Sequence, residues 1–200
     1  MARPAPLTTR VLLTCAAIGV ATGVLQAGAG ALSGVIVAAW PILYGLVLGI
    51  HVLPGVIAQE LLRQPWVALL THVIAALVAS AVVPVWIGRY IGTAILIGLL
   101  QEGVAALTSY RRWEPWRFFV SAVVVGVVIG AAIWFAADVT QFRQWQQVVY
   151  VALFVIGPIA WTAVGLGIGR ALRRAGVRPP VAPLPAPAPA PKAQPPSSEG

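Results

Sequence analysis

The sequence predicts an all-α integral membrane protein with six transmembrane helices. The 200-residue chain is 60% hydrophobic, and only 9% of its residues are charged, against roughly 25% in a soluble domain. Apolar runs recur from Arg10 to Arg170, and several reach the length of about 20 residues that a membrane-spanning helix needs. We therefore expect one helical domain, multi-pass in the cell membrane.

The first helix follows Arg3 and Arg10, which at first resemble the basic start of a signal peptide. The apolar run is too long for one and lacks a clear small-residue cleavage site, so we interpret it as a retained helix. The others follow in order, with bounds good to a few residues. The expected helices run over about 10–31, 35–58, 65–84, 90–110, 116–137 and 147–170.

Prolines make two of these helices irregular. The second contains Pro41, Pro54 and Gly55, so we expect it to be broken or re-entrant. Such backbone is tolerated at membrane depth where protein or a watery cavity covers it. Pro158 lies within the sixth helix and predicts a kink there.

The positive charges predict which ends of the helices face the cytoplasm. Cytoplasmic loops carry an excess of Lys and Arg. With the N-terminus inside, only Arg89 and Arg143 of the 13 Lys and Arg residues fall outside. The cytoplasmic set is Arg3, Arg10, Arg63, Arg111, Arg112, Arg117, Arg170, Arg173, Arg174, Arg178 and Lys192. An even number of helices returns the C-terminus to the cytoplasm, so we predict an N-in, C-in topology.

Two terminal segments flank the predicted membrane domain, which covers residues 10–175. We expect residues 1–9 to form a short cytoplasmic N-terminus. Residues 176–200 form a tail rich in proline and alanine. This composition cannot build a core, and we expect an extended, polyproline-like, disordered segment. The tail is either a solvated end or a tether for a partner.

Several classes of function are disfavoured. The net charge of +8 does not indicate a nucleic-acid partner, because the arginines lie at helix ends and form no basic face with interleaved aromatics. Cys15 is the single cysteine, so we expect a buried, inert thiol and no disulfide or cysteine-based metal cluster. No nucleophile elbow, zinc-helix motif or phosphate loop is present. We expect no enzyme, no cofactor and no resident metal.

The most distinctive polar residues are Gln101 and Glu102. They lie within an apolar stretch, residues 92–113, that ends at Arg111 and Arg112. A carboxylate at membrane depth is costly unless it is paired, hydrated or protonated, so by default it marks a functional site. His51 and His72 lie on other helices without metal-ligand spacing.

Aromatic residues gather near the predicted outer interface. One interpretation is the interfacial belt found in many membrane proteins. The other is a pocket that binds a flat, partly cationic ring by stacking or cation–π contact. The residues concerned are Trp40, Tyr44, Trp86, Tyr90, Trp134, Trp145 and Tyr150.

Small residues recur at helical spacing in the first helix. Ala17 and Ala21 are four apart, as are Gly19 and Gly23, and then Gly23 and Ala27. This spacing lets another helix approach closely. The partner is either a helix of the same bundle or another membrane subunit.

The stretch from Tyr44 to Trp113 resembles the YkoE-type substrate-binding (S) components of energy-coupling factor (ECF) transporters. The shared features are an LPG turn at 53–55, an arginine before a proline at 63–65, the carboxylate Glu102, and a YRRW end at 110–113. Two positions depart from the family pattern. Trp66 stands where glycine is usual, and His72 stands where a glutamate is expected.

The resemblance implies an uptake module for thiamine or its hydroxymethylpyrimidine precursor. The S component would capture substrate outside and be reoriented by a transmembrane T component and two cytoplasmic ATPases. It also implies that Ala17 and Ala21 form the surface that meets the T component. The residues expected to contact ligand are Glu102, Gln101, His72, Tyr44 and Trp86.

Two alternatives remain open. The chain could be an S component for another vitamin, a small solute or a metal ion. A metal site of this kind would need histidines and carboxylates near the N-terminus, and residues 1–3 offer none. The chain could also be a structural membrane subunit without a transport role.

Overall fold

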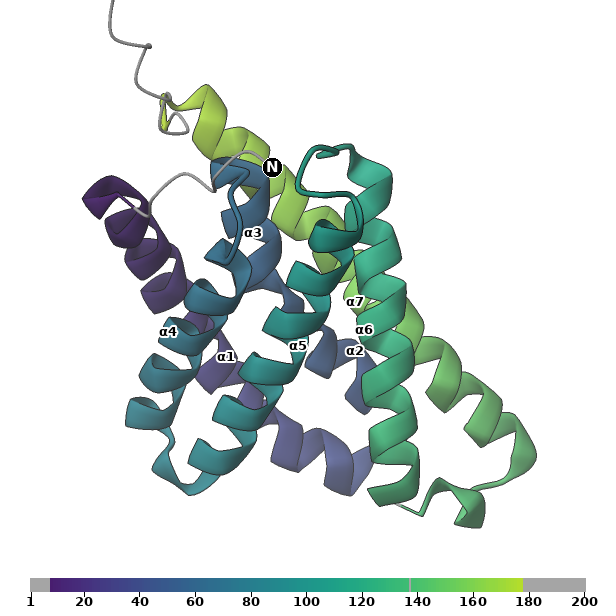
Figure 1. The fold of residues 1–200 in the computed structure, drawn as a ribbon. Coiled ribbons are helices and arrows are strands. Elements are labelled where there is room, and N and C mark those ends of the chain that lie inside the picture. The colour runs from purple at the N-terminus through teal and green to yellow at the C-terminus, as the bar shows by residue number, and fades with distance from the viewer. Residues whose placement is uncertain (1–7, 137, 178–200) are drawn as a thin grey trace, which may run out of the picture.

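The computed structural model describes residues 8–136 and 138–177, and the regular secondary structure of those residues is entirely helical (Figure 1). The prediction of an all-α chain is therefore confirmed. The α-helices are α1 (Thr9–Ala39), α2 (Tyr44–Leu48), α3 (Leu53–Leu62), α4 (Val67–Val82), α5 (Ile87–Leu107), α6 (Pro115–Ala136) and α7 (Gln144–Arg174). Short 3-10 helices are η1 (Pro41–Leu43), η2 (Gly49–Val52), η3 (Pro84–Trp86) and η4 (Val139–Gln141).

Among residues 8–136 and 138–177, helix length and hydropathy identify five segments that can cross a bilayer. They are Thr9–Ala39, Pro41–Leu62, Pro84–Leu107, Pro115–Ala136 and Gln144–Arg174. Helix α4 is apolar but has only 16 residues, which is about 24 Å at 1.5 Å per residue. The sixth span therefore stays a prediction, with α4 as its candidate. The predicted terminal segments, 1–9 and 176–200, lie almost wholly outside the described residues.

The first helix is longer than predicted. An end near residue 31 and a new helix from 35 were wrong, because α1 continues to Ala39. Glycines such as Gly30 and Gly34 lower helix propensity by up to about 1 kcal/mol each but leave the backbone hydrogen bonds intact. The helix ends at Trp40 (φ −144°, ψ 73°), because Pro41 disfavours the helical conformation of the residue before it.

The irregularity expected of the second span is confirmed. The segment Pro41–Leu62 divides into η1, α2, η2 and α3, and every residue from Leu48 to Leu62 is buried. Gly49 permits a close approach to α7, because a Cβ there would lie 2.5 Å from the carbonyl carbon of Gly157. The broken backbone is thus enclosed by the other helices, as membrane depth requires.

Small residues on α1 face two directions. Gly19 and Gly23 pack against α4, where a Cβ on Gly23 would lie 2.6 Å from the Ala75 carbonyl oxygen. Ala17 and Ala21 lie on an exposed face of the same helix. The glycines therefore serve packing within the bundle, whereas the alanines remain available on its surface.

The arginines gather at one end of the molecule, which we call the basic end. Here α1 begins, α3 passes to α4, α5 passes to α6, and α7 ends (Figure 1). Glu60 on α3 forms ion pairs with Arg170 and Arg173 of α7 at this end. The segments that meet at this end carry Arg10, Arg63, Arg111, Arg112, Arg117, Arg170, Arg173 and Arg174. The starts of α5 and α7, at the opposite end (Figure 1), carry Arg89 and Arg143. This asymmetry supports a cytoplasmic basic end.

Cysteine labelling tests that orientation. A cysteine replacing Arg143 should react in intact cells with a membrane-impermeant maleimide, and one replacing Arg112 should react only after permeabilisation. The native Cys15 is fully buried and should give little background. Protection at 143 together with reaction at 112 would reverse the topology.

The contact between α1 and α4 predicts a position-specific loss of stability. Gly23→Val places new atoms against Ala75 and Val78, so we expect a loss of about 1–3 kcal/mol, as overpacking typically costs. Gly28→Val is the matched control, because nothing lies within 4 Å of a Cβ at Gly28 on the same helix. Thermal unfolding in detergent measures both, and equal losses would contradict the packing argument.

Candidate ligand-binding site

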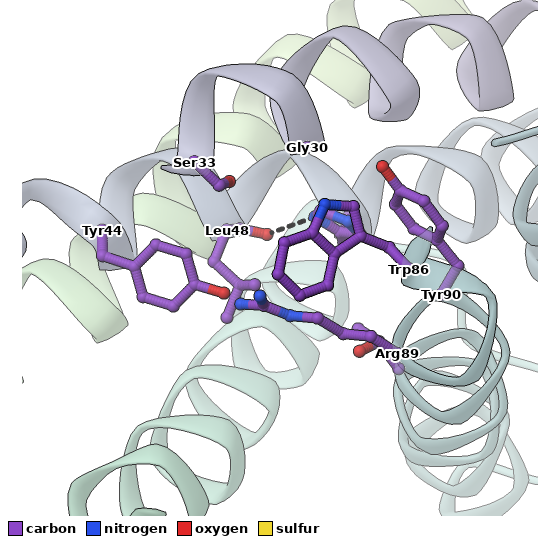
Figure 2. A pocket seen from close by; sticks show the side chains of 9 residues that line it. Gly30, Ser33, Tyr44, Leu48, Trp86, Arg89 and Tyr90 are labelled. Carbon is purple, nitrogen blue, oxygen red and sulfur yellow. Dashed lines mark hydrogen bonds between the residues drawn. The ribbon is translucent and has the colours of Figure 1, made fainter. Parts of the chain in front are cut away.

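A small recess, shown in Figure 2, lies around the start of α5, at the end opposite the basic end. Helix α1, the second segment and the start of α5 contribute its walls. Its volume is about 20 Å³, which is room for roughly one water molecule. The residues that line it are Gly30, Ser33, Tyr44, Leu48, His51, Trp86, Arg89, Tyr90 and Thr93. Two of the five predicted ligand residues, Tyr44 and Trp86, therefore lie together in one hollow.

The Arg89 side chain packs against both of these rings. Its guanidinium carbon lies 5.3 Å from the centre of the Tyr44 ring and 5.2 Å from that of Trp86. Figure 2 shows the side chain extending past Trp86 toward Tyr44. These distances are within the range of cation–π attraction. Among residues 8–136 and 138–177, the ion pairs are those of Glu60, so no carboxylate there neutralises Arg89.

A larger, open cavity adjoins the recess, and most of the α5 and α6 residues that line it are exposed. It lies between α2, α5 and α6, has a volume of about 450 Å³, and shares Tyr44, Leu48, Arg89 and Thr93 with the recess. Small-molecule sites commonly have volumes of roughly 300–1,000 Å³. The remaining lining is largely apolar, from residues of α5 and α6 such as Leu96, Ile129 and Ile133. Arg89 and Thr93 thus stand between a water-sized recess and a cavity of vitamin size.

The Tyr44 hydroxyl is left without a protein partner. Tyr44 is 5% exposed, and its Oη has no hydrogen bond to any described residue. Its ring is held edge-on against Phe154, with centroids 6.0 Å apart. A buried tyrosine usually satisfies its hydroxyl. The hydroxyl therefore offers a fixed, unused hydrogen-bonding group at the boundary of both hollows.

Other polar groups of the recess already bond to the backbone. Ser33 Oγ donates to the carbonyl of the residue four positions earlier at 2.8 Å. His51 Nδ1 lies 3.0 Å from the Leu48 carbonyl oxygen (Figure 2), and because a carbonyl only accepts, Nδ1 carries a proton. The His51 ring also stacks on Tyr90, with centroids 6.3 Å apart. These contacts hold the walls of the recess in place.

Glu102, on α5, does not line the recess; its side chain contacts the first residues of α4. Its carboxylate accepts hydrogen bonds from the backbone N–H groups of Trp66 (3.0 Å) and Ala68 (2.8 Å). Trp66 has a positive φ of 68° and makes no side-chain cap of its own. A carboxylate here satisfies orphan N–H groups and complements the positive end of the helix dipole. Glu102 thus supplies to α4 the cap that its own sequence lacks.

Gln101 and His72 form a second interior contact. His72 Nε2 lies 3.0 Å from Gln101 Oε1, and Gln101 Nε2 donates to the Val52 carbonyl at 3.1 Å. Gly55 makes room for the pair, since a Cβ there would lie 1.8 Å from Gln101 Oε1. None of Glu102, Gln101 and His72 lines the recess. Their predicted contact with ligand stays a prediction, while the structure gives each of them protein partners.

The five predicted ligand residues did not include four other polar or aromatic residues of the recess, namely His51, Arg89, Tyr90 and Thr93. Tyr90 did belong to the aromatic set considered for a pocket. A further signal existed for Arg89, Tyr90 and Thr93. Trp86, Arg89, Tyr90 and Thr93 follow one another at spacings of three and four, which places them on one face of a helix. Arg89 had been interpreted through topology alone.

Ala17 and Ala21, predicted to meet a partner, line a separate apolar groove. It lies on the surface between α1, α3 and α7 and has a volume of about 410 Å³. The lining residues are Thr14, Ala17, Ile18, Ala21, Thr22, Ile57, Leu61, Ile168, Leu172 and Val177. Its small residues would let a helix approach closely.

Comparisons with known proteins identify relatives of the sequence and of the fold. A family model described as "ABC-type cobalt transport system, permease component" matches residues 10–128. No curated protein matches the sequence. A solved structure titled "Crystal structure of an S-component of ECF transporter" is similar with a TM-score of 0.77 and 20% sequence identity, covering 85% of this chain and 87% of that chain. At this identity the likeness shows a shared fold.

Substitution of Glu102 tests its role at α4. Glu102→Ala leaves two backbone N–H groups without an acceptor, so we expect a loss of about 1–3 kcal/mol in stability, and a smaller loss for Glu102→Gln. Glu114→Ala, at an exposed position, is the control. Thermal unfolding measures the effect, and an unchanged Glu102→Ala would contradict the cap. Normal ligand affinity in Glu102→Gln would overturn its predicted ligand contact.

Proposed function

Because the chain belongs to the family of permease components of ABC-type cobalt transport systems, we propose that it is the substrate-binding S component of an ECF importer. It is a multi-pass protein of the plasma membrane. The observation that carries the proposal is an S-component fold over 85% of the chain, with a ring-lined recess at the end opposite the arginines. The proposed role is transport without catalysis.

The charge distribution supports capture from outside. With the basic end in the cytoplasm, as the positive-inside rule favours, the recess between α1, α2 and α5 opens outward. Arg89 at the recess then belongs to the outer face, in agreement with the predicted N-in, C-in topology. Substrate would enter there and leave on the other side after the protein is reoriented.

The proposed substrate is thiamine or its hydroxymethylpyrimidine precursor. Three features of the hollow support a small flat ring of this kind: the Tyr44 and Trp86 rings, the unused Tyr44 hydroxyl, and the adjoining volume of about 450 Å³. Aromatic walls with a few placed polar groups are typical of small-molecule sites. The order of the motifs between Tyr44 and Trp113 favours this family of substrates over other vitamins.

Cobalt is the second candidate substrate, since the matching family is described by it. A divalent cobalt site favours imidazole and carboxylate ligands. Among residues 8–136 and 138–177, no group of three or more His, Cys, Asp or Glu side chains converges. His51 and His72 are moreover engaged by the Leu48 carbonyl and by Gln101. The donor set in this part of the chain fits an organic ring better than a metal ion.

Partners are needed to supply energy, because the sequence contains no phosphate-binding loop. We propose a transmembrane T component and two cytoplasmic ATPases. The groove that Ala17 and Ala21 line is the proposed contact for the T component, since it is apolar and lies on α1 beside α3 and α7. The alternative, a structural subunit without a transport role, would bind no solute. Solute binding therefore distinguishes an S component from a structural subunit.

Ligand binding by the purified chain tests the proposal. Thiamine, hydroxymethylpyrimidine and Co²⁺ are titrated calorimetrically, and we expect binding of at least one of the two organic ligands. Tyr44→Phe should weaken it about threefold to tenfold, the equivalent of one hydrogen bond, without loss of thermal stability, because the removed hydroxyl has no protein partner. Tyr150→Phe, a buried tyrosine outside both hollows, is the control.

Three results would contradict parts of this proposal. Binding of Co²⁺ alone would favour the metal substrate. Binding of no ligand, together with failure to support uptake when the chain is expressed with a T component and its ATPases, would favour a structural subunit. Equal affinity in Tyr44→Phe and wild type would remove Tyr44 from the site.

A further inference from the structure

We propose that Arg89 makes the two adjoining hollows, the recess and the larger cavity, selective for ligands with uncharged or anionic rings and unfavourable for permanently cationic ones. The inference rests on the proposed function and names the charge class of its substrate. Of the two proposed ligands, it favours the neutral pyrimidine over thiamine, whose thiazolium ring carries a fixed positive charge. The expectation of a partly cationic ligand, which the aromatic residues alone had suggested, is thereby reversed.

The position of Arg89 is the first step of the argument. The side chain lines both the recess and the larger cavity, so a ligand in either hollow lies near it. Arginine stays protonated in proteins. Neither set of lining residues includes a carboxylate, and the ion pairs within the described chain belong to Glu60 at the basic end. A bound cation would therefore meet an unneutralised like charge.

The aromatic faces give a second, independent reason. A cationic ring would bind most favourably over the face of a tyrosine or tryptophan. The faces of Tyr44 and Trp86 are already occupied by the Arg89 guanidinium, at 5.3 and 5.2 Å. A cationic ligand would have to displace this internal cation before it gained the same attraction. The affinity of a neutral ring does not depend on cation–π attraction, so this internal cation costs it less.

The hydrogen-bonding groups of the two hollows also favour a neutral or anionic ligand. Arg89 is a donor only, with a planar fork of five N–H groups that matches carboxylate and phosphate oxygens. The Tyr44 hydroxyl is buried and unpaired among the described residues, and the Thr93 hydroxyl lines both hollows. This set suits ligands rich in acceptors, such as ring nitrogens, a hydroxyl or a phosphate group.

Three ligands that share one pyrimidine test the proposal: hydroxymethylpyrimidine (neutral), its monophosphate (anionic) and thiamine (cationic). Calorimetry on the purified full chain should show thiamine as the weakest ligand, by at least tenfold relative to the better of the other two. Arg89→Gln should narrow this gap to within about threefold, because it lowers affinity for the monophosphate and raises it for thiamine. Arg89→Lys keeps the charge and should keep the order of ligands.

Arg143→Gln is the matched control, since Arg143 is exposed at the same end but lines neither hollow; it should behave as wild type. Thiamine binding as tight as that of the neutral pyrimidine in wild type would overturn the charge selection and leave the proposed function standing. An unchanged ratio in Arg89→Gln would do the same. If wild type binds none of the three, the proposed function fails, and the inference fails with it.

Discussion

Two adjacent polar side chains on α5 connect this helix to its neighbours. Gln101 bonds to His72 on α4 and to a backbone carbonyl of the second segment, while Glu102 accepts from two N–H groups at the start of α4. Gln59 on α3 reaches the Gln101 carbonyl at 3.5 Å and accepts from Arg117 on α6. Hydrocarbon offers no water to such groups, so they must be satisfied within the protein. This requirement fixes how the four helices meet.

The broken second segment depends on the same requirement. Breaks between α2, η2 and α3 release carbonyl groups from the regular helical pattern, and side chains from other helices bind them. Trp161 on α7 donates to the Leu46 carbonyl at 2.9 Å, and Gln101 donates to that of Val52. Close approach of these side chains needs small neighbours, and Gly55 leaves the space that Gln101 fills. The irregular backbone is therefore stabilised by tertiary contacts.

The recess differs from this interior in what it leaves unsatisfied. The Tyr44 hydroxyl has no partner among the described residues. Arg89 contacts two aromatic rings, whereas the polar side chains of the interior contact hydrogen-bonding groups. Arg89 and Glu102 are 13 positions apart on α5, about 20 Å at 1.5 Å per residue. Helix α5 thus carries Arg89, which is free to contact a ligand, near its start, and Gln101 and Glu102, which bind other helices, near its end. That separation assigns capture to one end and helix assembly to the other.

Composition, apolar run lengths and arginine positions by themselves determined that the chain is helical, embedded in a membrane and asymmetric in charge, because the bilayer imposes these properties on any sequence that crosses it. They also indicated the irregular second segment through Pro41, Pro54 and Gly55. Only the tertiary structure decided which polar groups meet. Glu102 was conspicuous as a carboxylate in an apolar run, but its partners are backbone N–H groups 34 and 36 residues away, which no local pattern specifies. The aromatic residues were visible too, yet only the fold placed Arg89 over two of them.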